Sequence, residues 1–210
     1  DRASAGTTGL EPKVLFQVRS GLSDLQWSPD GTMLAFSSAR DGRSILGVWN
    51  LQRAELRWLT NTVDRDSSPR WSPDGSRLAF LRRPVDHRGF AICVVDVGSG
   101  EATELWRSPG DGTGSYPGSV AGSYGLMFGD GHIVFAGEWS GWNHLYVIPD
   151  GGGEVRELTP GDGIVENAHL SPDGMSENAT CRDCSLIVCV ESCSSSVASA
   201  SWSPIPGGET

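Results

Sequence analysis

The chain has 210 residues, of which 38% are hydrophobic and 8% aromatic, so it is long enough for a sizeable core in one or two domains. Its net charge is −10 and its basic residues are scattered, which argues against the concentrated positive face that nucleic-acid binding requires. Without any run of about 18 apolar residues, we expect no membrane span.

The sequence Trp-Ser-Pro-Asp-Gly, followed by Leu-Ala-Phe, occurs first from residue 27 and again 44 positions later from residue 71. Weaker copies begin at Phe128, which lacks the Ser-Pro, and at Leu170, after which the pattern is lost. A period of about 40–50 residues is typical of a β-propeller blade. The residues that define the copies are Trp27, Pro29, Asp30, Gly31, Trp71, Pro73, Asp74, Gly75, Asp130, Gly131, Pro172, Asp173 and Gly174.

Turn and strand signals alternate within the first unit. In the turn at residues 28–31, proline suits position i+1 of a type I turn, and glycine accepts a left-handed φ at the exit. Leu34 and Phe36 lie two apart and share one face of a strand. Residues 45–51 predict a third strand and residues 55–60 a fourth, more exposed one. Four antiparallel strands per unit is the architecture of a blade.

The tryptophan that opens each strong copy has two interpretations. Trp27 and Trp71 could be binding aromatics, or they could pack between blades. Their recurrence with the period of the fold favours the structural role.

We therefore predict an all-β partial propeller of about four blades, each of four antiparallel strands. The predicted domain covers residues 14–174, and an atypical Cys- and Ser-rich tail covers residues 175–210. The expected blades cover roughly residues 14–60, 61–106, 120–160, and 161–174 onward.

The tail holds four of the five cysteines within 13 residues, namely Cys181, Cys184, Cys189 and Cys193. Zinc sites usually separate their two cysteine pairs by a dozen residues or more, so the spacing disfavours a metal site. Disulfides are the alternative in an oxidising compartment. A tail outside the repeat, from a truncated or frame-disrupted gene, is a further hypothesis.

The search for catalytic residues gives no acid–base pair or nucleophile. The nearest string to the Gly-x-Ser-x-Gly of serine hydrolases begins at Gly122 and is one residue short, inside a Gly-rich stretch that we interpret as an inter-blade loop. The four histidines lack metal-ligand spacing. Residues 151–153, all glycine, fit a hairpin better than a phosphate loop. We predict no catalytic residue, no metal and no cofactor in this chain.

The segment from residue 135 to residue 174 is the most specific in the chain. It carries a Gly-Trp-Asn-His-Leu-Tyr string, and its defining residues are Trp139, Gly141, Trp142, Asn143, His144, Leu145 and Tyr146. It closely resembles the N-terminal β-propeller of the prolyl oligopeptidase family of serine peptidases, in particular the dipeptidyl peptidase IV-like branch. The Trp-Ser-Pro-Asp-Gly repeat is also similar to that of the TolB propeller. The resemblance covers roughly residues 14–174.

In that family a propeller of seven or eight blades caps an α/β-hydrolase domain, whose Ser-Asp-His triad cleaves after proline or a similar residue. The resemblance implies a non-catalytic domain that gates oligopeptide substrates, with the hydrolase domain as its partner. Glu138 and Glu166 are candidates for the acidic pair that binds the substrate amine in dipeptidyl peptidases.

The alternative function is a stand-alone TolB-like propeller that binds protein partners in the cell envelope. The sequence leaves the compartment open: a cytoplasmic location and a periplasmic or secreted one are both compatible with it. An open propeller exposes the faces and strand edges of its end blades, so we expect marginal stability and self-association.

Overall fold

The structure is a computed structural model that describes residues 14–86, 89–109, 125–139, 141–170, 177–181 and 185–188. Every regular element in these residues is a β-strand, which confirms the predicted all-β class. None of the described segments is a helix long and apolar enough to cross a membrane.

The strands follow one another in four groups along the chain. The first group consists of β1 (Leu22–Trp27), β2 (Met33–Arg40), β3 (Arg43–Asn50) and β4 (Glu55–Trp58). The second consists of β5 (Arg65–Trp71), β6 (Arg77–Arg83), β7 (Ala91–Asp96) and β8 (Ala102–Arg107). The third consists of β9 (Leu126–Phe128), β10 (His132–Gly137), β11 (His144–Pro149) and β12 (Arg156–Glu157). The fourth consists of β13 (Val165–Leu170), β14 (Glu177–Cys181) and β15 (Ser185–Val188).

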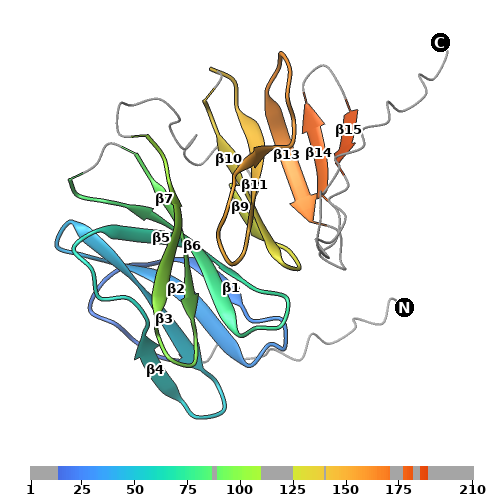
Figure 1. Ribbon diagram of the computed structural model, residues 1–210. Helices are drawn as coiled ribbons and strands as arrows, with labels where there is room; N and C mark the ends of the chain where they lie inside the picture. The colour runs from blue at the N-terminus through green and yellow to red at the C-terminus, as the bar shows by residue number, and fades with distance from the viewer. Residues whose placement is uncertain are drawn as a thin grey trace, which may run out of the picture.

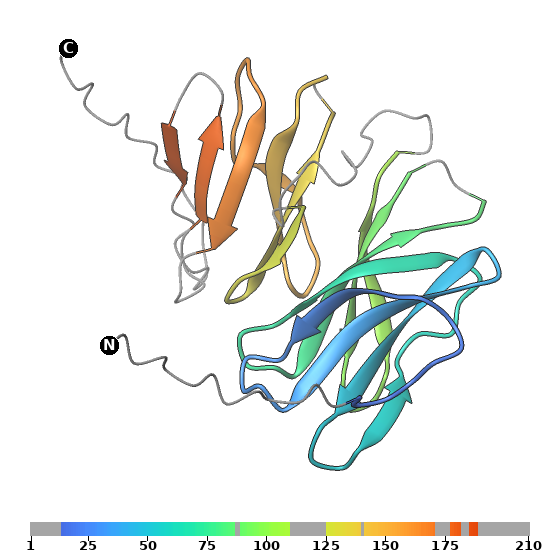
Figure 2. The ribbon, with the colours of Figure 1, turned by 180° about the vertical axis from the view of Figure 1, so that it is seen from behind.

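Consecutive strands pair antiparallel within each group, as expected for propeller blades. One parallel pairing, Ser44 with Arg65, joins the first two groups into a formal eight-stranded sheet. The third and fourth groups are separate sheets. Figures 1 and 2 show the sheets arranged in chain order as an open fan, and among the described strands β1 does not pair with β15.

Three hydrophobic cores lie between neighbouring blades. The core between blades 1 and 2 includes Leu46 and Phe80, and the core between blades 2 and 3 includes Ile92 and Phe135. A third core joins Leu145 of blade 3 to blade 4. Successive side chains of one strand point to opposite faces, so the middle strands are apolar on both sides. Each blade is therefore buried by its neighbours rather than by a separate layer.

Strand pairing continues past Gly174, where the sequence pattern is lost. β14 pairs with β13, and β15 pairs with β14. Residues 171–176 and 189–210 lie outside the described residues. The division of the chain into a propeller and a tail at this point stays a prediction.

Candidate functional site

The turn between β1 and β2 is held by its own side chains. The Ser28 hydroxyl donates to the Asp30 carboxylate at 2.6 Å and accepts the Met33 amide at 2.9 Å. The Asp30 carboxylate also accepts the Thr32 amide at 3.0 Å. Gly31 has a φ of 69°, the left-handed conformation expected at the turn exit. Serine and aspartate thus replace bonds that the turn backbone cannot make itself.

The turn between β5 and β6 repeats this arrangement. Ser72 donates to Asp74 at 2.6 Å, and Asp74 accepts the Ser76 amide at 3.0 Å. These bonds, that of the Ser72 hydroxyl first, lower the pKa of Asp74 to about 2. Gly75 again has a left-handed φ, of 72°. Pro29 and Pro73, the prolines of the two turns, are exposed, as expected for turn residues.

The third copy keeps the exit glycine without the serine. Gly131 has a φ of 74°, and the backbone carbonyl of Asp130 contacts Nδ1 of His132 at 2.8 Å. The fourth copy, with Pro172, Asp173 and Gly174, lies outside the described residues.

The two equivalent tryptophans differ in burial. Trp71 is 9% exposed and its indole Nε1–H donates to the carbonyl of Gln26 in blade 1 at 3.0 Å. Trp27 is 52% exposed. Trp71 therefore packs between two blades, whereas the described residues place no blade against Trp27.

The first strands of neighbouring blades contact one another through polar groups as well. Asp24 and Ser68 are 44 positions apart, and each has a positive φ, of 53° and 56° respectively, at an irregularity in strand pairing. The Asp24 carboxylate accepts the Ser68 amide at 3.1 Å and the Ser37 hydroxyl at 2.6 Å. Arg70 extends the series, since its Nε–H donates to the carbonyl of Leu126 in blade 3 at 3.0 Å.

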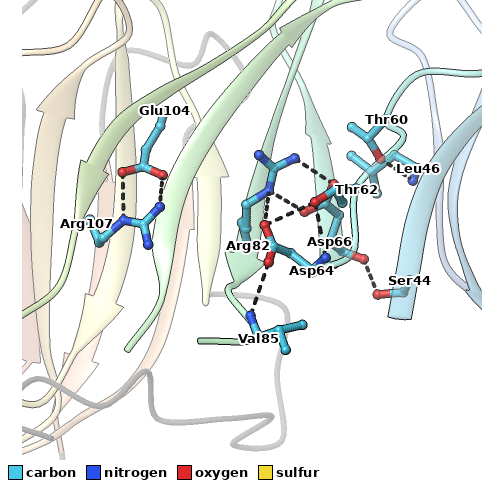
Figure 3. Close-up of polar contacts among 10 residues, drawn as sticks. All are labelled: Ser44, Leu46, Thr60, Thr62, Asp64, Asp66, Arg82, Val85, Glu104 and Arg107. Atoms are coloured by element: carbon cyan, nitrogen blue, oxygen red, sulfur yellow. Dashed lines mark hydrogen bonds and ion pairs between the residues drawn. The ribbon is translucent and has the colours of Figure 1, made fainter. Parts of the chain in front are cut away.

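A buried ion pair lies at the start of blade 2 (Figure 3). The Arg82 guanidinium makes two bonds to the Asp66 carboxylate, at 2.8 and 2.9 Å, and Asp66 is 0% exposed. This hydrogen bonding raises the pKa of Arg82, which stays charged. Asp64 lies 3.7 Å from the same guanidinium, and Ser44 of blade 1 donates to the carbonyl of Asp66 at 2.7 Å. The network fixes the linker between blades 1 and 2.

Sequence reasoning missed this network. The signal is present as paired cross-strand positions, since Asp66 lies opposite Arg82 in the β5–β6 register. That register cannot be read without knowing the irregularity between Ser67 and Arg70.

The segment with the Gly-Trp-Asn-His-Leu-Tyr string contributes to the core between blades 2 and 3. The rings of Trp139 and Tyr146 meet edge to face, with centroids 4.0 Å apart. Trp106 of blade 2 lies 5.0 Å from the Trp139 ring and 5.4 Å from Phe135. Burial raises the pKa of Tyr146 to about 12, so its phenol stays neutral at physiological pH.

The same segment also holds the start of blade 4. The side-chain amide of Asn143 donates to the Val165 carbonyl at 3.0 Å, and the Val165 amide donates to the Asn143 carbonyl at 2.8 Å. His144 contacts the Glu157 carboxylate through Nδ1 and the Gly163 carbonyl through Nε2, the latter at 3.0 Å. We call these contacts the blade 3–4 clasp.

Three other residues of the segment have separate positions. Leu145 is fully buried in the core between blades 3 and 4. Trp142 is 43% exposed, and Gly141 has a φ of 84° in the loop between β10 and β11. The segment is thus mainly structural, with Trp142 as its exposed part.

The remaining candidates lie apart along the chain, and several fall outside the described residues. Glu138 is half-buried just after β10, and Glu166 lies in β13 with its side chain outside the described part. Cys181 lies in β14, whereas Cys184, Cys189 and Cys193 lie outside the described residues. Within the described ranges, no three His, Cys, Asp or Glu side chains come together as metal ligands.

A cleft of about 540 Å³ lies where the turns of blades 1 and 2 meet. Arg53, Glu55 and Asp96 line it, with Met33 and Val97 as apolar neighbours. The charges that line it are mixed, because an arginine lies beside two carboxylates.

The sequence matches the family model of the TolB beta propeller domain over residues 6–198. Since the match covers most of the chain, the protein belongs to this family, in agreement with its blades and repeated turns. No curated protein sequence matches the chain.

Several solved structures share the fold. TolB from Acinetobacter baumannii matches 88% of this chain and 44% of its own length, with a TM-score of 0.61 and 18% identity. Dipeptidyl peptidase 4 from Porphyromonas gingivalis matches 80% of this chain and 29% of its own, with a TM-score of 0.55 and 15% identity. A puromycin-hydrolyzing peptidase from Mycobacterium tuberculosis matches 80% of this chain and 29% of its own length, with a TM-score of 0.53 and 19% identity. The chain thus spans less than half the length of these proteins, and the likeness concerns the fold alone.

Proposed function

We propose that this chain is the substrate-gating propeller of a prolyl oligopeptidase-family serine peptidase. The observation that carries the proposal is the segment from Trp139 to Tyr146, whose sequence resembles that of the family's propellers. The similarity of the fold to two peptidases supports it further. In this role the propeller restricts access to oligopeptides, while an α/β-hydrolase domain cleaves them.

The first strands supply the surface for such gating. β1 lies against β5, and β5 lies against β9, so their residues form one continuous rim. Asp24 and Arg70 give this rim charges of both signs, and their bonds to neighbouring blades hold it rigid. A rigid polar rim can select substrates by size and orient a peptide backbone.

The alternative is a TolB-like propeller that binds protein partners in the cell envelope. The family match and the 88% coverage by a TolB structure favour it. The two functions differ in whether a hydrolase accompanies the propeller.

The test begins with the genomic DNA beyond codon 210, read in every frame. The peptidase proposal predicts an α/β-hydrolase sequence there, and an unrelated sequence in all frames would contradict it. The encoded hydrolase is then assayed with and without this chain. We expect the chain to suppress cleavage of an unfolded protein several-fold while leaving a short proline-containing anilide unaffected; equal effects on both substrates would refute gating.

A further inference from the structure

The first strands of blades 1 and 2 have the same sequence pattern and different surroundings. Leu25 and Trp27 of β1 are both 52% exposed. The equivalent residues of β5, Pro69 and Trp71, are buried. The difference cannot come from the strand itself, because both strands precede the same turn and carry the same irregularity in pairing.

The neighbouring blade explains the difference. β1 covers β5, and two hydrogen bonds join the strands. The indole of Trp71 donates to the Gln26 carbonyl, and the amide of Ser68 donates to the Asp24 carboxylate. The face of β1 that carries Trp27 therefore corresponds to a face that binds another blade's first strand. The contact between β1 and β5 shows what kind of partner would cover this face of β1: an antiparallel sheet whose first strand has a backbone carbonyl at the position equivalent to Gln26.

The strand of blade 4 that corresponds to β1 is β13. Leu170 occupies the position of Trp27 in the repeat, so the carbonyl of residue 169 corresponds to that of Gln26. Within the described ranges no strand follows β15, and the groups that contain β1 and β13 are the first and the last of the fan (Figure 1). Their two surfaces can meet between molecules.

We propose that two copies of this chain pair head to tail, β1 of each on β13 of the other, and close one ring of blades. Each copy contributes four blades, two of them joined in the eight-stranded sheet, and the sum of eight is within the range of about 4–8 blades found in propellers. The pair is closed because each copy uses both of its ends. The proposal does not depend on the peptidase assignment.

The energetics of the contact set its salt dependence. Trp27 is a large aromatic side chain, the kind that anchors protein interfaces when it becomes buried. Each copy carries a net charge of −10, so the copies repel one another at low ionic strength. Screening by salt therefore strengthens the pairing, in contrast to an interface held by ion pairs.

The test is sedimentation velocity over a concentration series, at about 20 mM and about 300 mM salt. We expect a monomer–dimer equilibrium that moves toward dimer at higher salt, without larger species. Trp27→Ser combined with Leu25→Ser is expected to weaken dimerisation at least tenfold. Trp142→Ser, which removes a similarly exposed tryptophan from a loop outside the contact, is the matched control and is expected to leave it unchanged.

A second readout locates the contact. Hydroxyl-radical footprinting is expected to show Trp27 protected in the dimer and oxidised in the monomer, with Trp142 oxidised in both. The proposal is overturned by a monomer at every concentration, by a dimer that the Leu25 and Trp27 substitutions leave intact, or by an open series of oligomers. If this chain is part of a longer polypeptide and a later blade of that polypeptide covers β1, the longer polypeptide stays a monomer at every concentration, which also overturns the proposal.

Discussion

At the scale of single residues, the signature turns are small hydrogen-bonded units whose aspartates must be ionised. The folded state holds the pKa of Asp74 at about 2, below its ordinary 3.8, mainly through the Ser72 hydroxyl. A depressed carboxyl pKa stabilises the fold above the unfolded value, and this contribution is lost as the pH falls from about 4 toward 2. We expect the Asp74 carboxyl carbon to titrate near pH 2 in an NMR experiment.

The two equivalent turns provide a test variant and a matched control for this titration. Ser72→Ala is expected to move the Asp74 midpoint back toward 3.8, because it removes the largest cause of the shift. Ser28→Ala, in the other turn, is expected to change Asp30 and leave Asp74 as it was. An Asp74 midpoint that does not respond to Ser72→Ala would contradict this account of the turn.

The two tryptophans provide a second residue-scale prediction. Trp71→Phe removes a buried indole and leaves the Gln26 carbonyl without its donor, which we expect to lower the free energy of unfolding by about 1–3 kcal/mol. Trp27→Phe, at the half-exposed equivalent, is expected to cost less than about 0.5 kcal/mol in dilute solution. Urea unfolding measures both, and equal losses would show that the two positions are equally buried.

At the scale of elements, glycine allows a close approach inside blade 1. A Cβ on Gly47 would lie 2.6 Å from the Phe36 ring and 3.0 Å from Trp58. We expect Gly47→Ala to lower the melting temperature, with a cost of about 1–3 kcal/mol, because the two rings must move. Gly21→Ala is the control, since a Cβ there meets no atom within 4 Å. A Gly47→Ala protein as stable as Gly21→Ala would contradict the packing described for β2, β3 and β4.

The blade 3–4 clasp gives the other element-scale prediction. Asn143→Ala removes the side-chain bond to Val165, and we expect faster hydrogen exchange at the Val165 amide. Amides of β10 and β11 should keep their protection. Trp142→Ala, next to the clasp but exposed, is expected to leave Val165 unchanged. Equal acceleration of Val165 and of β10 would mean that the substitution loosens blade 3 instead.

Many of the strands and turns could be predicted from the sequence. The period and the turn chemistry indicated the blades, because Pro, Asp and Gly have local conformational preferences that need no tertiary context. The predicted strand at residues 45–51 corresponds to β3, and that at 55–60 to β4, which ends at Trp58. The strand ends differ because the regular backbone pairing stops there: the Leu59 amide still donates to the Leu46 carbonyl at 2.9 Å, but the Leu46 amide donates to the hydroxyl of Thr60 at 2.9 Å.

The site was less predictable than the strands. The Asp66–Arg82 pair and the clasp at Asn143 join residues that are 16 and 22 positions apart, through strand registers that the sequence does not display. The burial of Trp71 and the exposure of Trp27 depend on the presence of a neighbour, which identical motifs cannot reveal. Past Gly174, β14 and β15 pair without the Leu-x-Phe pattern, since backbone bonds form with many side chains.

At the scale of the whole molecule, stability is the sum of contacts between successive blades. The same junction can be apolar or charged. Met33 and Val97 pack against the core between blades 1 and 2, and the equivalent position between blades 2 and 3 holds the Arg77–Asp150 ion pair. The packing of neighbouring blades therefore tolerates different side chains at this position of the junction, provided that the two side chains that meet are complementary.

The most direct test of this account is a double-mutant cycle on Arg77 and Asp150, which are 73 positions apart and meet only if blades 2 and 3 pack side by side. Arg77→Met, Asp150→Asn and the double variant are compared by urea unfolding. Both side chains are partly exposed, so we predict a coupling of about 0.5–1 kcal/mol that weakens in high salt. Strictly additive losses, with zero coupling at low salt, would contradict the side-by-side packing of the blades.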